Sequence, residues 1–287
     1  MRTALPVLAV LAALATVAVP APADEPAKIA LPARSYVTVQ ESVLVTDPAT
    51  GVARAVTVAK HVPVAVTYAA DPKKTAVIVC DMWDDHWCKK ASERCGELAK
   101  KAEPVLKACR DSGMTIIHCP SDTMAFYKDH AARKRTLAVK KAEPPKGKEL
   151  PNPPLPVDDS DGGCDDEKPA KQHRAWTRQH ATITIDADKD YITDNGGEAY
   201  SVLKEKGIDT VIVMGVHTNM CVLNRSFAIK QMVKWGVRTF LVRDLTDAMY
   251  NPKMKPMVTH DKGTQLIIEH IEKHWCPTIE SKSLLGK

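Results

Sequence analysis

The sequence has few aromatic residues and lacks several common functional motifs. Phenylalanine occurs only three times, and aromatic residues make up 5% of the 287 residues. The chain contains no phosphate-binding glycine loop, no dinucleotide fingerprint, no His-Glu-x-x-His and no Cys-x-x-Cys. The usual motifs for nucleotide binding, zinc peptidase activity and paired-cysteine metal binding are therefore missing.

The charge pattern also argues against a nucleic-acid partner. The formal net charge is +5, and the basic clusters 133–135 and 140–141 lack interleaved aromatic residues. An apolar content of 44% with 26% charged residues is ordinary for a globular protein. We expect a globular protein that binds a small molecule rather than nucleic acid.

The N-terminus resembles a secretory signal peptide over residues 1–23. Arg2 precedes an apolar stretch from Leu5 to Val19, and Ala21-Pro22-Ala23 supplies small residues before a cut ahead of Asp24. An uncleaved anchor is the alternative, but the apolar part is short for a membrane span. We predict an exported protein, periplasmic or secreted, with no membrane association after signal removal.

Strand and helix patterns alternate in residues 73–280. This alternation predicts an α/β domain with a mainly parallel sheet of five or six strands and helices on both faces. The expected strands are Ala76–Cys80, Met114–His118, Ala181–Ile185, Thr210–Met214 and Arg238–Val242, and the expected helices lie within Lys89–Ser112, Glu198–Lys206, Cys221–Trp235 and Gly263–His274.

Two segments stand outside this alternation. Residues 24–72 contain β-type stretches around the turn Asp47–Gly51, which predict a small N-terminal β extension covering a surface or edge of the main domain. Residues 129–175 are rich in Pro, Lys and Asp and form a long loop insertion, of a length typical of lids and mobile segments. Its acidic stretch Asp158–Glu167 resembles a calcium loop only poorly, because Val157 occupies the first ligand position.

One cysteine is placed to act as a nucleophile. The strand Thr210–Met214 runs into the turn 215–220 and then into a helix that begins at Cys221. Unpaired N–H groups at a helix N-terminus lower a thiol pKa and hold an oxyanion. The alternative is a buried structural cysteine.

A carboxylate follows a second apolar strand. Asp81 comes directly after Ala76–Cys80, and ligands of open α/β sheets bind at the carboxyl ends of strands. Asp81 and Cys221 both lie at such ends, so they form a candidate base and nucleophile. A helix cap or turn residue is the alternative for Asp81.

These segments resemble the isochorismatase-like cysteine hydrolases, which include nicotinamidases and N-carbamoyl amidohydrolases. The resemblance runs from Lys73 to Thr278 and is most specific at Gly215-Val-His-Thr-Asn-Met-Cys-Val222. It implies a three-layer α/β/α sandwich, a homo-oligomer, a triad of Asp, Lys and Cys, and a cis peptide between His217 and Thr218. Asp81 and Cys221 match the triad.

The lysine of the triad matches less well. Lys189 is the nearest candidate, displaced by a few residues and set among three aspartates, and a solvated loop charge is its alternative. If it does not reach the site, Arg178, His180 or His217 has to supply the positive charge.

The resemblance also implies a possible divalent metal, because nicotinamidases hold such an ion near the substrate. The family's metal-binding Asp-x-His is absent from this sequence. His118, Asp122 and His86 form a scattered alternative set, and a histidine that ends a strand is more often a core or turn residue. We therefore predict no metal ligands. Trp83 and Trp87, together with His118, are the candidate pocket residues, with loop packing as the alternative for the tryptophans.

The predicted reaction is hydrolysis of a C–N bond in a small amide or carbamoyl substrate through a thioester. Asp81 takes the thiol proton, and the N–H groups of Met220 and Cys221 form the oxyanion hole. The alternatives are a weak or inactive relative that binds a small molecule and a papain-like peptidase, which would need a distant histidine.

Export would allow disulfides among the eight cysteines. Seven remain beside Cys221, so at least one more thiol is unpaired or bonded to another molecule. Cys88, Cys164 and Cys276 have polar surroundings in the sequence and are the better disulfide candidates, whereas Cys80 and Cys119 end apolar runs and are expected in the core.

Overall fold

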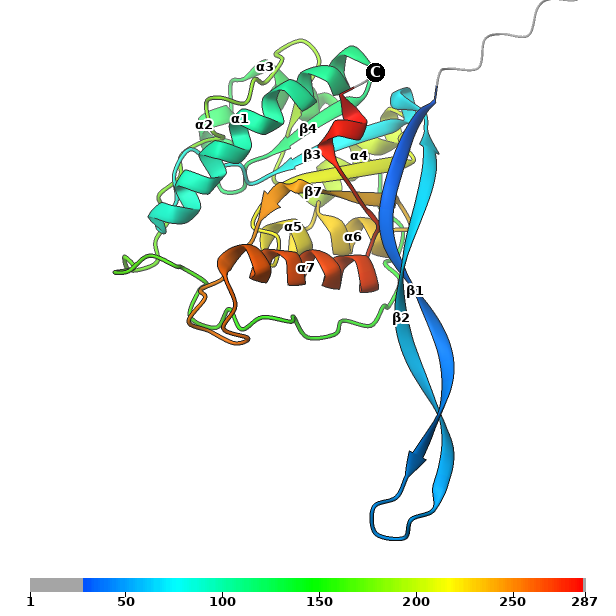
Figure 1. Cartoon of the computed structure of the whole chain (residues 1–287). Coiled ribbons are helices and arrows are strands. Elements are labelled where there is room, and N and C mark those ends of the chain that lie inside the picture. Colours follow the sequence, from blue (N-terminus) through cyan, green and yellow to red (C-terminus); the bar gives the residue numbers. More distant parts are fainter. Residues whose placement is uncertain (1–27, 286–287) are drawn as a thin grey trace, which may run out of the picture.

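The computed structural model describes residues 28–285, so the predicted signal peptide lies outside the described part of the chain. An eight-stranded sheet runs through the molecule, in the order β2-β1-β8-β7-β6-β3-β4-β5 (Figure 1). Six of its strands, from β8 to β5 in this order, are parallel to one another, as expected for an α/β domain. They are β3 (Thr75–Cys80), β4 (Thr115–Cys119), β5 (Tyr191–Ile192), β6 (Thr210–Val216), β7 (Arg238–Asp247) and β8 (Thr278–Ile279).

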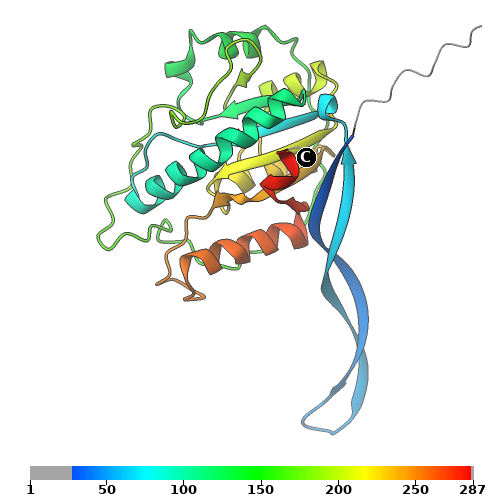
Figure 2. The same cartoon turned by 45° about the horizontal axis from the view of Figure 1, so that its top comes forward.

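The two central strands, β3 and β6, are buried along their whole length, which explains their continuous apolar sequences. One face of the sheet packs against α1, and the other packs against the helices α4 to α7, so the domain has three layers (Figure 2). These helices are α1 (Lys89–Asp111), α4 (Gly196–Glu205), α5 (Cys221–Asn224), α6 (Ile229–Lys234) and α7 (His260–His274).

The N-terminal extension is one long hairpin of β1 (Ile29–Thr46) and β2 (Ala53–Ala70), paired along the whole length of both strands. Only its base joins the main sheet, where Ala33 and Arg34 of β1 pair with β8. The rest projects away from the domain as a twisted two-stranded ribbon (Figure 1). The hairpin therefore covers the β8 edge of the sheet with its base alone.

Two predicted elements are wrong. The segment Ala181–Ile185 is a loop, because the N–H of Thr184 bonds to Glu103 and the N–H of Ile183 bonds to the carbonyl of His180 instead of to a neighbouring strand. The short edge strand β5 takes its place in the sheet. The helix expected over Cys221–Trp235 is interrupted, because Arg225 has an extended ψ of 153°.

The insertion 129–175 follows β4 and a short helix, α2, and contains one helix, α3, followed by a long irregular stretch. The remaining short elements are α2 (Met124–Tyr127), α3 (Ala131–Ala138) and the 3-10 turns η1 (Pro72–Lys74) and η2 (Ser281–Leu284). Among residues 28–285, no helix has both the length and the apolar character needed to cross a bilayer.

Candidate active site

A glycine brings the two functional strand ends together. Gly215 near the end of β6 has a φ of +123°, and a Cβ atom there would lie 2.0 Å from the carbonyl oxygen of Cys80 on β3. Only glycine permits this approach without a shift of the backbone. As a result, the turn that carries Cys221 lies beside Asp81.

Asp81 is fully buried and accepts hydrogen bonds from two directions. Its Oδ1 accepts the backbone N–H of Ser121 at 2.7 Å, and its Oδ2 accepts Arg225 Nε at 3.0 Å. The thiol of Cys221 lies near this carboxylate, close enough for the Asp81 charge to act on the thiol pKa. The structure thus places the predicted base and nucleophile beside each other at neighbouring strand ends.

Burial raises the pKa of the Asp81 carboxyl above its ordinary value, against the opposing effect of Arg225 and of the Ser121 N–H. Burial, followed by the nearby Asp81 charge, also raises the pKa of the Cys221 thiol. The expected lowering by a helix N-terminus is wrong, since α5 has only one turn and its dipole is correspondingly small. The resting nucleophile is a thiol beside a base.

Arg225 supplies the positive charge that we assigned to Lys189. The side chain of Lys189 is 68% exposed, and its ammonium lies 3.9 Å from Asp186, so the structure does not bring it to Asp81 and Cys221. Arg225 instead donates to the carboxylate, and its charge is near enough to the thiol to oppose the rise in the thiol pKa that burial causes. Its position four residues after Cys221 on a helical turn was the sequence signal for it, because side chains at that spacing share a face.

The three alternative cations do not take this role. Arg178 lies 3.7 Å from Asp84 and stacks on Phe126. His180 is partly exposed, and burial lowers its pKa, so it carries no charge at neutral pH. His217 is buried, and desolvation lowers its pKa to about 3.

The turn before the nucleophile contains a cis peptide bond, one residue earlier than predicted. It joins Val216 and His217 rather than His217 and Thr218. Thr218 holds the turn against β7, since its N–H donates to the Asp247 carbonyl at 2.8 Å and its hydroxyl lies 2.7 Å from that of Thr246.

The predicted oxyanion hole is only half present. The N–H of Met220 donates to the carbonyl of His217 at 3.0 Å, so it is already occupied. The N–H of Cys221 stands at the first position of α5, where no acceptor exists within the helix. The Cys221 N–H is therefore the donor available to an oxyanion.

Two cavities meet at Cys221. The first, of about 490 Å³, is lined by Leu155, Asp159, Asn219, Met220, Cys221, Asn224 and Arg225. The second, of about 180 Å³, is aromatic, and its lining includes Trp83, Trp87, Trp176, His86, His217 and Cys221. Trp83 and Trp176 stack with their ring centroids 4.1 Å apart. Both predicted tryptophans thus line a cavity with the nucleophile, and Trp176, the residue after the insertion, joins them.

His118 is not a pocket residue, which corrects our prediction. Its ring is fully buried, with Nδ1 2.9 Å from Gln179 and Nε2 3.0 Å from Asp190. Both ring nitrogens are therefore occupied in the protein interior.

The residues present do not fit the metal site that the family resemblance raised. His118 has no free nitrogen, and the Nδ1 atom of His86 accepts the N–H of Cys88. Asp122 lies 3.7 Å from Arg225. Within residues 28–285, the one group of three side chains close enough to share a metal is Cys88, Cys164 and Asp166.

The fold and the site together define an α/β sandwich that presents a thiol, a carboxylate and a guanidinium at one edge of its sheet. The isochorismatase domain model matches residues 75–260, and the chain belongs to this family of hydrolases. No curated protein sequence matches the chain.

Solved structures of related fold include a cysteine hydrolase from Pseudomonas syringae pv. phaseolicola 1448A, which is 16% identical, with 75% of this chain and 92% of that chain covered and a TM-score of 0.46. An isochorismatase-like hydrolase from Alkaliphilus metalliredigens is 17% identical, with coverage of 74% and 97% and a TM-score of 0.42. N-carbamoylsarcosine amidase from Thermoplasma acidophilum is 16% identical, with coverage of 72% and 96% and a TM-score of 0.39. Likeness at this level carries no argument about the substrate.

Proposed function

We propose that the protein is a cysteine hydrolase that cleaves a C–N bond of a small amide or carbamoyl substrate through a thioester. The observation that carries this proposal is the partly buried Cys221 thiol, which lies beside the Asp81 carboxylate and the Arg225 guanidinium. The base beside the thiol is a carboxylate rather than a histidine ring, which disfavours the papain-like alternative.

The first chemical step transfers the thiol proton to Asp81 as sulfur attacks the substrate carbonyl carbon. The raised pKa of Asp81 suits this role, because a base works best when its pKa approaches the working pH. Arg225 lies beside both groups and stabilises the thiolate as it forms.

The second step breaks the C–N bond. The Cys221 N–H binds the tetrahedral oxyanion, a contribution of about 3 kcal/mol for one well-placed donor. Asp81 returns its proton to the departing amine, and the thioester remains on the sulfur. Water then attacks the thioester with Asp81 as the base, which releases the acid and restores the thiol.

The lining of the aromatic cavity favours a substrate whose acyl group is small and uncharged. Desolvation lowers the pKa of His86 to about 4 and that of His217 to about 3, so both rings are neutral near pH 7. The buried His217 Nε2 and Trp176 Nε1 atoms have no hydrogen-bond partner in the described residues. Buried polar atoms usually have partners, so these two are suited to the polar atoms of a substrate.

The test is ammonia release from a panel of small amides and carbamoyl compounds. The wild-type enzyme is expected to turn over at least one of them, and Cys221→Ser is expected to lose the activity. Cys109→Ser removes another buried thiol, on α1, and is the matched control that should stay active. Full activity in Cys221→Ser would exclude the proposed nucleophile.

The main competing function is a binding protein without catalysis. It is favoured by the raised pKa of the Cys221 thiol, which lowers the population of reactive thiolate. An aldehyde analogue of a bound amide distinguishes the two, because a nucleophilic Cys221 forms a hemithioacetal that reduces the rate of thiol alkylation. Binding of the analogue with an unchanged alkylation rate would support the binding protein.

The proposal also includes export and self-association. Export depends on the apolar N-terminus, and the mass of the mature protein is expected to correspond to cleavage before Asp24. Self-association depends on the family resemblance, and light scattering is expected to give a mass above the 31.4 kDa of one chain.

A further inference from the structure

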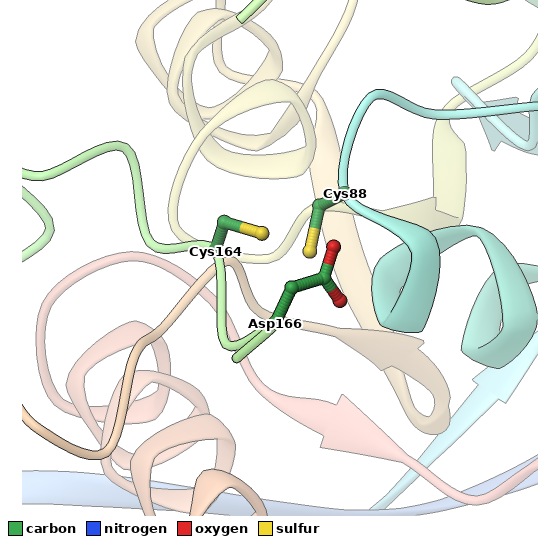
Figure 3. Close-up of side chains that lie close together, drawn as sticks. All are labelled: Cys88, Cys164 and Asp166. Carbon is green, nitrogen blue, oxygen red and sulfur yellow. The ribbon is translucent and has the colours of Figure 1, made fainter. Parts of the chain in front are cut away.

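Two cysteines that are far apart in the sequence lie together beside the aromatic cavity. The sulfur atoms of Cys88 and Cys164 and a carboxylate oxygen of Asp166 all lie within 4.8 Å of one another. Figure 3 shows the two sulfur atoms turned toward each other from separate segments. Cys88 is the residue before α1, and Cys164 belongs to the insertion. Both side chains are buried.

The insertion is held at this place by several contacts. Gly163 has a φ of +71°, and a Cβ atom there would lie 2.3 Å from the carbonyl oxygen of Met249, so the backbone beside Cys164 packs tightly on the domain. Asp166 accepts the N–H groups of Lys89 at 2.9 Å and Lys90 at 3.1 Å, which are orphan donors at the start of α1.

Asp165, the residue before Asp166, makes a second group of contacts with α1. Arg94 of α1 binds both carboxylate oxygens of Asp165, at 3.0 and 3.1 Å, and donates to Asp247 at 2.9 Å. Lys90 donates to the carbonyl of Asp165 at 2.9 Å. The proximity of the two thiols is thus built into the docking of the insertion on α1.

We propose that Cys88 and Cys164 form a disulfide that fastens the insertion to the start of α1. The two side chains pack with Trp87, Ala91 and Met249 and lie beside the carboxylates of Asp165 and Asp166. A neutral cystine suits this place, because it puts no thiolate next to these negative charges. A divalent metal suits it less well, because only three donors are present and both Asp166 oxygens already accept N–H groups.

The bond can form with any disulfide donor, for which oxidised glutathione is the probe. The thiolate of one cysteine attacks the glutathione disulfide and releases one reduced glutathione. The second cysteine, after losing its proton, attacks the resulting mixed disulfide and releases the other. Two protein thiols are thereby oxidised to one cystine, and one glutathione disulfide is reduced to two thiols.

The bond has a structural consequence for the site. Gly162 of the insertion and Trp176, which directly follows the insertion, line the aromatic cavity together with Trp87, one residue before Cys88. A cross-link between residues 88 and 164 therefore limits the opening of this wall. It also reduces the conformational freedom of the unfolded chain. The bond itself does not depend on the proposed hydrolysis.

The test uses the full chain incubated with oxidised glutathione and then denatured and alkylated. The expected result is two fewer alkylated thiols than after reduction, and a peptide map that joins the Cys88 and Cys164 peptides. Cys88→Ser and Cys164→Ser are expected to lose this linkage. Cys276→Ser is the control that keeps it, because Cys276 packs in the main core with Trp275.

Two results would overturn the proposal. One is alkylation of both Cys88 and Cys164 in the oxidised wild-type protein, which needs no variant and so does not depend on the folding of a mutant. The other is one zinc ion per purified chain, measured by elemental analysis, that is lost in both serine variants while the thiols stay reduced. A further expected result is a thermal midpoint several degrees higher for the oxidised than for the reduced wild-type protein.

Discussion

Among the buried carboxylates that pair with an arginine, Asp190 and Asp81 have pKa values shifted in opposite directions. Asp190 accepts the Nε and Nη2 groups of Arg110, lies 3.0 Å from His118 Nε2, and accepts the N–H of Asp186 at 2.8 Å. These donors lower its pKa to about 2, although burial alone would raise it. Burial prevails at Asp81 and raises the pKa.

The difference lies in how the lone pairs of each carboxylate are used. All the partners of Asp190 are structural groups that stabilise its charge. Asp81 has one backbone donor, one partly exposed arginine and the thiol of Cys221. A buried carboxylate with fewer hydrogen-bond donors binds a proton more readily, because its charged form is less stabilised. Asp81 is therefore suited to exchange a proton, whereas Asp190 stays charged.

The largest expected effect is that of Asp81→Asn on catalysis. The amide keeps the size of the side chain and can still accept the Ser121 N–H, but it cannot take a proton from sulfur. We expect kcat/KM to fall by about 10³–10⁴-fold. The free energy of unfolding at pH 7 should not fall, because the variant no longer buries a carboxylate whose charged form is disfavoured.

Ammonia release measures the first quantity, and urea unfolding measures the second. A variant that keeps activity within a factor of ten would show that Asp81 is not the base. A large loss of stability would show that the charge of Asp81, like that of Asp190, stabilises the fold.

The corresponding change at the second carboxylate, Asp190→Asn, should act on stability. It leaves the buried guanidinium of Arg110 without its counter-charge. We expect a loss of about 3–5 kcal/mol in the free energy of unfolding, as for other broken buried ion pairs. Turnover per folded molecule should stay within a few-fold of wild type, and a loss of turnover as large as that in Asp81→Asn would contradict the comparison.

The sequence could predict the active carboxylate but not its companion. Asp81 follows a continuous apolar strand, and a charged residue at such a strand end is a visible signal. Asp190 stands in a polar segment, and its partner Arg110 is 80 residues away in the chain. No local pattern reveals that pairing, and the edge strand β5 has only two residues, too few for a period.

The third member of the site shows a similar limit. The family resemblance led us to predict Lys189 as the cation of the site. The i,i+4 spacing of Cys221 and Arg225 in the sequence would have indicated Arg225 instead. The mainly parallel sheet, in contrast, was predictable from the alternation of apolar strand patterns with helix patterns.

The comparison also predicts how stability depends on pH. The pKa of Asp190 is about 2 in the folded protein, below the ordinary 3.8. Its charge therefore stabilises the fold above about pH 4, and this contribution is lost as the pH falls from about 4 to 2. The difference corresponds to about 2 kcal/mol. Between pH 5 and 2, wild type should lose that much more stability than Asp190→Asn, and equal losses in urea unfolding would contradict this assignment.

The last prediction concerns the different roles of Arg225, which binds Asp81, and Arg110, which binds Asp190. Arg225→Gln removes the cation that lowers the pKa of Asp81, so this pKa should rise further, and the acidic limb of the pH profile of kcat/KM should move to higher pH. We expect about a 10–100-fold loss of kcat/KM near neutral pH, with part of it recovered as the pH rises. Arg225→Lys keeps the charge and should return the limb toward its wild-type position. Arg110→Gln is the matched control and should lower the thermal midpoint without moving the limb, because Arg110 binds Asp190 and not Asp81. An unmoved limb in Arg225→Gln would mean that this arginine only packs beside the thiol and does not tune the base.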